Sequence, residues 1–196
     1  MKNFKLIGLT GRTGSGKSVV REFFEENGYK VIDADTLARS AIENRIVKGD
    51  ILAAFGVDLL KDGEIDRKEL AKRAFSGSAE VNTLNAIMHP MIVFIFLGQL
   101  RELVDNGETK ILFDAPQLFE AKLDTICDYI IAVAAEDSLR IERIMKRDNI
   151  SRKMAEQRLS VQLSDGFFRE NSDFYLENNN SEKELKINLE KILSQI

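Results

Sequence analysis

The sequence predicts an α/β fold in which a parallel β-sheet is flanked by helices, and three observations indicate it. Short apolar runs alternate with segments of helical periodicity, as in strand–helix–strand units. The first run, Phe4–Leu9, leads directly into a glycine-rich segment, Gly11–Ser18, and a helical segment follows. The later runs are apolar throughout, as expected for parallel strands covered on both faces. With 196 residues, the chain fits one compact domain with insertions.

The first elements form a complete strand–helix–strand unit. After the strand Phe4–Leu9, the segment Val19–Glu26 carries apolar residues at helical spacing until Gly28 ends the helix. Lys30–Asp33 is a short second strand that ends on an acid, and Thr36–Ile46 has the spacing of a second helix.

A helical block follows, from residue 48 to residue 107. The predicted helices are Ile51–Phe55, Arg67–Phe75, Val81–Met88 and Pro90–Val104, and glycine-bearing turns occur at Gly56, Gly63 and Gly77. Because the block is long for a simple crossover between strands, we expect an inserted helical subdomain.

Strands and helices alternate again in the rest of the chain. Central strands are predicted at Ile111–Asp114 and Tyr129–Val133. The remaining predicted elements are helices at 138–147 and 152–163, a short strand at Phe174–Leu176 and a closing helix at Glu182–Ile196.

Composition narrows the class of protein. A net charge of −4 argues against broad affinity for nucleic acid, and we expect no nucleic-acid partner. The longest apolar run, Met91–Leu97, is far shorter than the roughly 20 residues that cross a bilayer, and the N-terminus enters the first strand without a signal-type segment. The single cysteine, Cys127, forms no internal disulfide. We therefore expect a cytoplasmic protein without a membrane segment.

The segment Gly11–Ser18 matches the phosphate-binding pattern G-x-x-x-x-G-K-[ST] between a strand and a helix. Such a turn directs backbone N–H groups and a positive helix end at one anion. We expect Lys17 to reach the β- and γ-phosphates and the Ser18 hydroxyl to bind Mg²⁺. The alternative is a chance glycine-rich turn. The expected phosphate-binding residues are Gly11, Thr13, Gly14, Ser15, Gly16, Lys17, Ser18 and Val19.

Three acids follow predicted strands, where ligands bind in doubly wound sheets. Asp33 is the candidate general base for a hydroxyl nucleophile, and the alternative is a structural turn acid. Asp35 is equally a helix N-cap. Asp114 resembles, weakly, the second acidic element that holds Mg²⁺ in phosphate-loop enzymes.

His89, the only histidine, precedes Pro90, which suits a first helical turn. His89 then makes either a helix-entry hydrogen bond or a substrate contact. Arg140, Arg143 and Arg147 recur at helical spacing, which places three guanidinium groups on one helix face. Such a face can close over a transferring phosphoryl group, whereas the alternative is a solvated face balanced by neighbouring acids.

Several segments together resemble the dephospho-coenzyme A kinase family. They are Leu9–Ser18, Val31–Asp35, Asp66–Leu70, His89-Pro90, Pro116–Glu120, Arg143–Asp148, Arg158 with Gln162, and Asn178-Asn179, in order along essentially the whole chain.

The resemblance implies ATP- and Mg²⁺-dependent phosphorylation of the ribose 3′-hydroxyl of dephospho-coenzyme A, giving coenzyme A and ADP. It implies a P-loop nucleotide-kinase core (about 1–47, 108–135 and 164–196), a helical substrate subdomain (48–107) and a helical lid (136–163). Carried over by motif, the catalytic residues are Asp33, Lys17, Arg143 and, less securely aligned, Arg140. Near the adenine or in the lid are Arg147, Asn178 and Asn179. Lining the acceptor side are Asp35, His89, Pro90, Leu118, Phe119 and Glu120.

Three positions depart from the family pattern: Gln117 where Leu is usual, Phe168 where a basic residue is expected, and Asn180 where Gly is usual. Asn180 can still adopt a left-handed turn. The rival interpretations are another small-molecule or nucleotide kinase, a nucleotide-binding switch protein and a non-catalytic binding module. We expect a monomer or a weak homo-oligomer.

Overall fold

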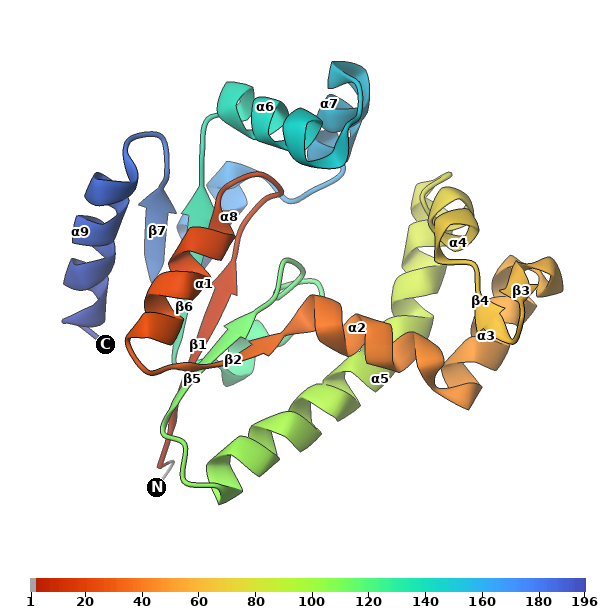
Figure 1. Cartoon of the computed structure of the whole chain (residues 1–196), viewed down its shortest axis with the longest axis horizontal. Helices are drawn as coiled ribbons and strands as arrows, with labels where there is room; N and C mark the ends of the chain where they lie inside the picture. The colour runs from red at the N-terminus through yellow and green to blue at the C-terminus, as the bar shows by residue number, and fades with distance from the viewer. Residues whose placement is uncertain (1–2) are drawn as a thin grey trace. The chain divides into compact units, whose positions relative to one another are not determined.

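The computed structural model describes residues 3–196 (Figure 1). The chain divides into two compact units, one made of Met1–Ile32 and Val104–Ile196 and the other of Asp33–Leu103. The second unit begins where the second strand ends, earlier in the chain than the predicted insertion at 48–107.

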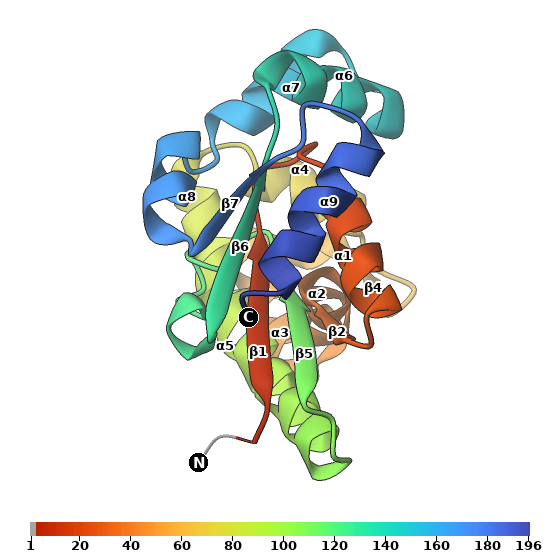
Figure 2. The ribbon, with the colours of Figure 1, turned by 90° about the vertical axis from the view of Figure 1, so that its left-hand side faces the viewer.

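The first unit is built around a five-stranded sheet. Its strands are β1 (Lys5–Thr10), β2 (Lys30–Asp33), β5 (Lys110–Asp114), β6 (Tyr129–Ala134) and β7 (Phe174–Glu177). They lie in the order β2-β5-β1-β6-β7 (Figure 2). β1 runs parallel to β5 and β6, and β7 runs parallel to β6. The predicted α/β fold with a parallel sheet is confirmed.

Two helices cover one face of this sheet. α1 (Lys17–Glu26) and α9 (Glu182–Leu193) share an apolar core with alternate residues of the strands, among them Ile7, Val133 and Leu176. α1 contributes apolar residues at helical spacing, as predicted, and Gly28 follows it with a φ of 83°. This packing fixes α1 directly behind the glycine-rich segment.

The opposite face of the sheet is covered by shorter segments. α8 (Asp165–Asn171) contacts β6 and β7 there, on the side of Tyr175. A Cβ on Gly8 of β1 would lie 2.7 Å from Leu118 and 3.0 Å from Cys127, so glycine lets the segment around the 3₁₀ turn η2 (Asp124–Ile126) approach closely. The sequence prediction missed α8, although Ser164, whose hydroxyl accepts the Phe167 N–H at 3.1 Å, is a helix N-cap signal.

α6 (Asp137–Asp148) and α7 (Arg152–Ser160) form a helical pair (Figure 1). They bury a small cluster of their own, Ile141, Ile144, Ala155 and Leu159. Asn149 ends α6 with a φ of 51°, a left-handed conformation that asparagine tolerates. α7 ends before the predicted Leu163 because apolar packing stops at Leu159: Val161 is 81% exposed.

The second unit is helical apart from one hairpin. Its elements are α2 (Ala34–Glu43), α3 (Arg45–Phe55), the 3₁₀ turn η1 (Val57–Leu59), β3 (Leu60–Lys61), β4 (Glu64–Ile65), α4 (Arg67–Ala74) and α5 (Ser78–Asp105). Their apolar faces meet in one cluster that includes Ile42, Ile51, Leu70 and Met88.

Two predictions for this unit were wrong in detail. The predicted helix Thr36–Ile46 breaks at Asn44, which has an extended conformation and accepts the Ile46 N–H at 2.9 Å, so that it caps α3. The short β3–β4 hairpin was missed, although its turn is Asp62-Gly63, with φ values of 50° and 84°. Asp-Gly is the hairpin turn signal that could have located it.

The predicted helix boundary at His89-Pro90 was also wrong, because α5 continues through Pro90. Proline removes one helical hydrogen bond, but Met88 before it and Ile92 after it pack against the same core, which holds both halves in one helix.

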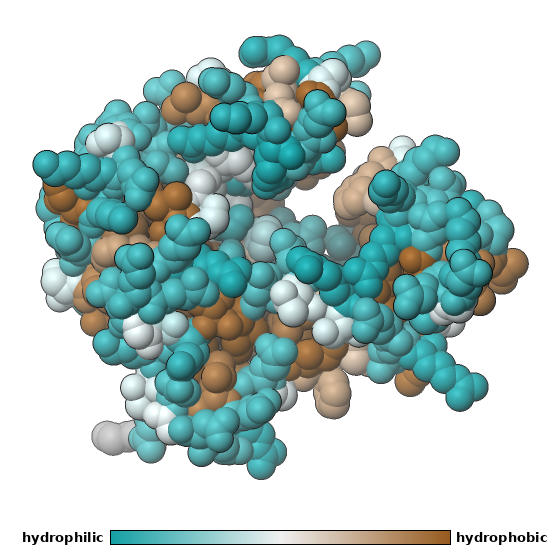
Figure 3. Space-filling view, viewed as in Figure 1, coloured by the Kyte–Doolittle hydropathy of each residue, from teal (hydrophilic) through white to brown (hydrophobic). Residues whose placement is uncertain are grey.

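By length and composition α5 is also long and apolar enough to cross a membrane. The viewed surface is mainly hydrophilic (Figure 3), and Phe94 of α5 is 73% exposed.

Candidate active site

The glycine-rich segment Gly11–Ser18 forms a tight loop between β1 and α1. Gly11 has a φ of 135°, and a Cβ there would lie 2.2 Å from the Val133 carbonyl oxygen of β6. Gly16 has a φ of 93°, and a Cβ there would lie 2.1 Å from the amide nitrogen of Asn178. Both φ values favour glycine, and at Gly11 the backbone of β6 also leaves no room for a Cβ.

Donors from distant segments hold the loop carbonyls. Arg143 of α6 donates to the carbonyl oxygens of Gly14 at 3.2 Å and Ser15 at 3.4 Å. The side-chain amide of Asn178, after β7, donates to the Ser15 oxygen at 2.9 Å. Because a trans peptide directs its C=O and N–H in opposite directions, the N–H of Gly16 points away from these donors. The carbonyl contacts therefore turn the Gly16 N–H toward the inside of the loop, where it can meet an anion, whereas the Ser15 N–H donates to the Arg12 carbonyl at 3.2 Å.

α1 begins at the end of the loop without a side-chain cap, since its N-cap is Gly16. The first N–H groups of the helix and its positive dipole end are thus directed at whatever occupies the loop. Lys17 lies in this first turn with its Nζ 3.5 Å from the Gly11 oxygen, and Ser18 is exposed beside it. Chemically, such an arrangement can receive an anion such as a phosphate group.

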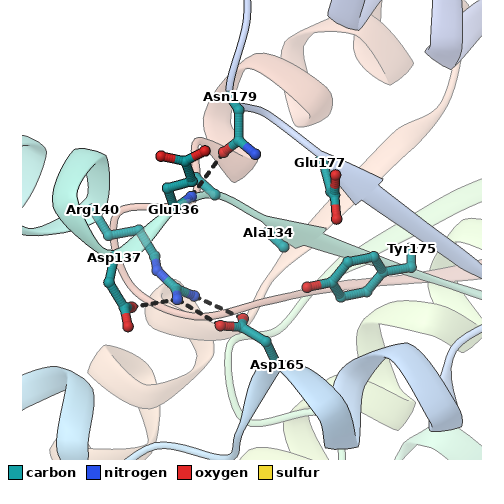
Figure 4. Close-up of a pocket in the computed structure, with 9 residues that line it drawn as sticks. Ala134, Glu136, Asp137, Arg140, Asp165, Tyr175, Glu177 and Asn179 are labelled. Carbon is teal, nitrogen blue, oxygen red and sulfur yellow. Dashed lines mark hydrogen bonds and ion pairs between the residues drawn. The ribbon is translucent and has the colours of Figure 1, made fainter.

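Arg140 makes different contacts from Arg143, although the two residues have the helical spacing from which a shared face was predicted. Its residue is 1% exposed, and its guanidinium donates to Asp165 at 2.6 and 2.8 Å and to Asp137 at 2.5 Å (Figure 4). Burial opposes its charge most strongly, yet the hydrogen bonds and charges of Asp165 and Asp137 leave the Arg140 pKa raised. Arg140 thus connects α6 to α8 through a buried ion pair with Asp165.

Asp165 also connects Arg140 to the loop, because its carboxylate binds Arg12 as well. The Arg12 guanidinium, in the loop, lies 3.1 Å from the Asp165 carboxylate and donates to the Leu159 carbonyl at 2.7 Å. The Arg140 hydrogen bonds, followed by the charges of Arg140 and Arg12, keep the Asp165 pKa below its usual value. No sequence pattern with a known chemistry indicated a role for Arg12 or Asp165.

A pocket of about 210 Å³ opens beside this ion cluster (Figure 4). It is polar, and the residues that line it are Ala134, Ala135, Glu136, Asp137, Arg140, Asp165, Tyr175, Glu177 and Asn179. Asn179 accepts the Glu136 N–H at 2.7 Å and so joins the end of β7 to the start of α6. Burial raises the pKa of Tyr175, and the Asp165 charge raises it further.

Arg147 lies apart from the loop contacts made by Arg143. Its guanidinium binds the Asp148 carboxylate at 2.8 and 2.9 Å, and Arg158 of α7 binds the same carboxylate. The three side chains tie the last turn of α6 to α7. The hydrogen bonds from Arg147 are the largest cause of the lowered Asp148 pKa.

The paired asparagines contact the loop and the start of α6. Asn178 is 8% exposed, and its backbone oxygen accepts a hydrogen bond from Arg143 at 3.2 Å. Asn178 therefore contacts both the loop carbonyl of Ser15 and the arginine that binds the same carbonyl. Asn180 does not take the left-handed conformation that was open to it; its side chain donates to Glu184 at 3.0 Å.

The residues of the Pro116–Glu120 loop differ in exposure. Leu118 is completely buried beside Gly8, which corrects its assignment to the acceptor side: it is a core residue. Phe119 is half-buried and packs edge-on against Phe167, with ring centroids 5.1 Å apart. Phe168, the departure from a basic residue, is 4% exposed in the same aromatic cluster. Glu120 is exposed.

The second unit holds the other candidates. Asp33 is the N-cap of α2, because its Oδ1 accepts the N–H groups of Asp35 at 2.8 Å and Thr36 at 3.3 Å. The proposed capping role of Asp35 was therefore wrong; Asp35 lies in the first turn. His89 and Pro90 lie inside α5, and the Nε2 of His89 is buried with no hydrogen-bond partner among residues 3–196.

Comparisons with known proteins agree on one family. A family model described as "Dephospho-CoA kinase" matches residues 5–184. A dephospho-CoA kinase of Fusobacterium nucleatum is 36% identical over 192 residues, covering 97% of this chain and 98% of the relative. One from Bacillus licheniformis is 34% identical over 96% of this chain and 94% of its own length.

Solved structures show the same fold. The structure of TT1252 from Thermus thermophilus superposes with a TM-score of 0.84 at 30% identity, covering 100% of this chain and 99% of the other. Dephospho-CoA kinase from Campylobacter jejuni gives a TM-score of 0.71 at 27% identity over 100% and 97%. Shikimate kinase from Acinetobacter baumannii, at 16% identity and a TM-score of 0.53, shares the fold alone.

Proposed function

The chain belongs to the dephospho-CoA kinase family and is an enzyme of that activity, and we propose which of its residues carry the reaction. ATP and dephospho-coenzyme A are its substrates, and coenzyme A and ADP its products. The observation that carries the assignment of residues is the loop whose Ser15 carbonyl is held from outside by Arg143 and Asn178, while the Gly16 N–H and the uncapped start of α1 are directed into the loop.

The loop Gly11–Ser18 binds the phosphates of ATP in this proposal. Lys17 places its ammonium on the β- and γ-phosphates, and Arg143 lies within reach of the same loop. Arg140 supports Arg143 by fixing α6, so we no longer place it on the transferring group.

The residues present fit a magnesium ion that is bound mainly by substrate. Mg²⁺ keeps several waters and takes one or two protein ligands together with substrate phosphates. Residues 3–196 contain no cluster of three acidic, histidine or cysteine ligands, whereas the exposed Ser18 hydroxyl stands at the loop, and Asp114 ends the neighbouring strand β5. The ion neutralises charge on the phosphates when bound, and Ser18 is the residue proposed to hold it.

Asp33 is the proposed general base. It ends β2, a strand of the sheet that also carries the loop, and its two hydrogen bonds to backbone N–H groups fix the carboxylate. A fixed carboxylate suits a base that must orient the 3′-hydroxyl of the ribose and accept its proton.

The acceptor side is proposed to involve Asp35, His89 and Pro90 of the second unit and Phe119 and Glu120 of the first. The buried, unsatisfied Nε2 of His89 supports a polar partner in the bound state, since a buried polar atom without a hydrogen bond is costly. Asn179 beside the pocket stays a candidate for the adenine side. We propose further that the enzyme is cytoplasmic and a monomer or weak homo-oligomer.

The experiment is a panel of acceptors with ATP and Mg²⁺: dephospho-coenzyme A, adenosine, AMP and no acceptor, with wild type and Lys17→Ala. We expect ADP formation with dephospho-coenzyme A alone and its loss in Lys17→Ala. Turnover with another acceptor would overturn the substrate, and full activity of Lys17→Ala would overturn the loop assignment.

A further inference from the structure

Gln162 lies just beyond the C-terminal end of α7, and its side-chain amide meets Thr13 in the phosphate-binding loop. The Thr13 N–H donates to the Gln162 oxygen at 3.1 Å, and the Gln162 nitrogen donates to the Thr13 hydroxyl at 3.0 Å. Both ends of the amide are used on one residue, 149 positions earlier in the chain. Such a reciprocal pair fixes orientation as well as distance.

Thr13 occupies the part of the loop that most needs support. It lies between Gly11 and Gly14, whose φ values of 135° and 80° are accessible to glycine and give the backbone freedom to pivot. The rear of the loop, Gly14 and Ser15, is held by Arg143 and Asn178. The front half of the loop, Arg12 and Thr13, is held instead by the segment between α7 and α8.

Arg12 reinforces the same attachment. Its guanidinium donates to the Leu159 carbonyl in the last turn of α7 and to Asp165 at the start of α8. Gln162 lies between these two attachment points in the chain. The segment from Leu159 to Asp165 thus contacts two consecutive loop residues at three of its own positions.

We infer that Gln162 is a positioning residue for phosphoryl transfer, which acts by fixing Thr13 and with it the front half of the phosphate-binding loop. Lys17 contacts the carbonyl of Gly11, two residues before Thr13, so movement of the front half displaces that contact. Donors act on the transition state only when they are already placed about 2.7–3.1 Å from the developing charge. Gln162 does not touch the transferring group; it keeps the loop that does in one geometry.

The inference rests on the proposed role of the loop in binding ATP, and its test is designed to separate the two. Gln162→Met keeps the length of the side chain and removes both hydrogen bonds. The matched control is Gln157→Met, an exposed glutamine of α7. Two neutral hydrogen bonds predict that kcat with ATP and dephospho-coenzyme A falls about 10- to 100-fold in Gln162→Met, with a smaller change in KM for ATP. Gln157→Met stays at the wild-type value.

A double-mutant cycle with Thr13→Val identifies the partner. If Gln162 acts through Thr13, the double variant loses about as much kcat as the worse single variant, whereas additive losses would overturn the inference. A kcat of Gln162→Met within about twofold of wild type, in a folded protein, would also overturn it. If Gln162→Met does not fold, Gln162→Leu, which also removes both hydrogen bonds, decides by the same limit. An inactive wild type would instead refute the proposed function.

Discussion

Replacing Asp165 with alanine tests whether the ion cluster around Arg140 is structural. The change removes two hydrogen bonds from a guanidinium whose side chain is 1% exposed and one from Arg12, and leaves Asp137 as the remaining partner of Arg140. Breaking a buried ion pair costs about 3–5 kcal/mol. Because the Asp165 side chain is 36% exposed and Asp137 remains, we expect a loss of about 2–3 kcal/mol.

The assay is thermal unfolding at pH 7, in which this loss corresponds to a fall in Tm of about 5–10 °C for a chain of this size. The matched control is Glu177→Ala in the same pocket, whose ion pair with Arg169 is exposed on both sides and should contribute little to stability. Equal falls in Tm for the two variants, or no fall for Asp165→Ala, would refute the reasoning that burial of Arg140 makes Asp165 indispensable.

Three further predictions concern pH, the base and the loop. The pKa of Asp165 is lowered in the folded state, so its stabilisation is complete above the unfolded pKa of about 3.9 and is lost as pH falls through the folded pKa. The Tm difference between wild type and Asp165→Asn should therefore stay constant from pH 6 down to about pH 4 and shrink at lower pH, and a difference that persists at lower pH would contradict this. Asp33→Asn should retain ATP affinity, measured by calorimetry, while kcat falls about 10²–10⁴-fold, and near-normal turnover would leave Asp33 only its capping role. Gly16→Ala should abolish ATP binding, because its Cβ meets the Asn178 amide, whereas Gly49→Ala, where a Cβ meets nothing within 4 Å, should bind ATP as wild type does.

The sheet and the loop could be predicted from the sequence because their signals are local. A buried strand, three glycines and Lys17 before Ser18 occur within one short segment, and the structure places them as a loop between β1 and α1. The continuous helix α5 could not be predicted, because Pro90 carries a local signal to stop, which packing of both halves against one core overrides.

The partners of the loop could not be predicted for a different reason. Arginines at regular helical spacing look equivalent in the sequence, yet Arg140 is buried on Asp165 while Arg143 reaches the loop carbonyls. Their separation depends on α8, a helix of 7 residues whose signal was missed. The roles of Arg12 and Gln162 depend on contacts between residues far apart in the sequence, which no local pattern indicates.

The hydrogen bonds from Arg143 and Asn178 to the loop also have a consequence for folding during synthesis. The loop is among the first segments to be synthesised, but its supports lie 129 residues later for the Arg143 contact and 163 residues later for the Asn178 contact. A nascent chain that has completed only its first strand–helix–strand unit has the whole nucleotide-binding motif without the groups that orient it. We therefore predict that competence to bind ATP arises late, after the segment with Asn178 has been synthesised and β7 has joined the sheet.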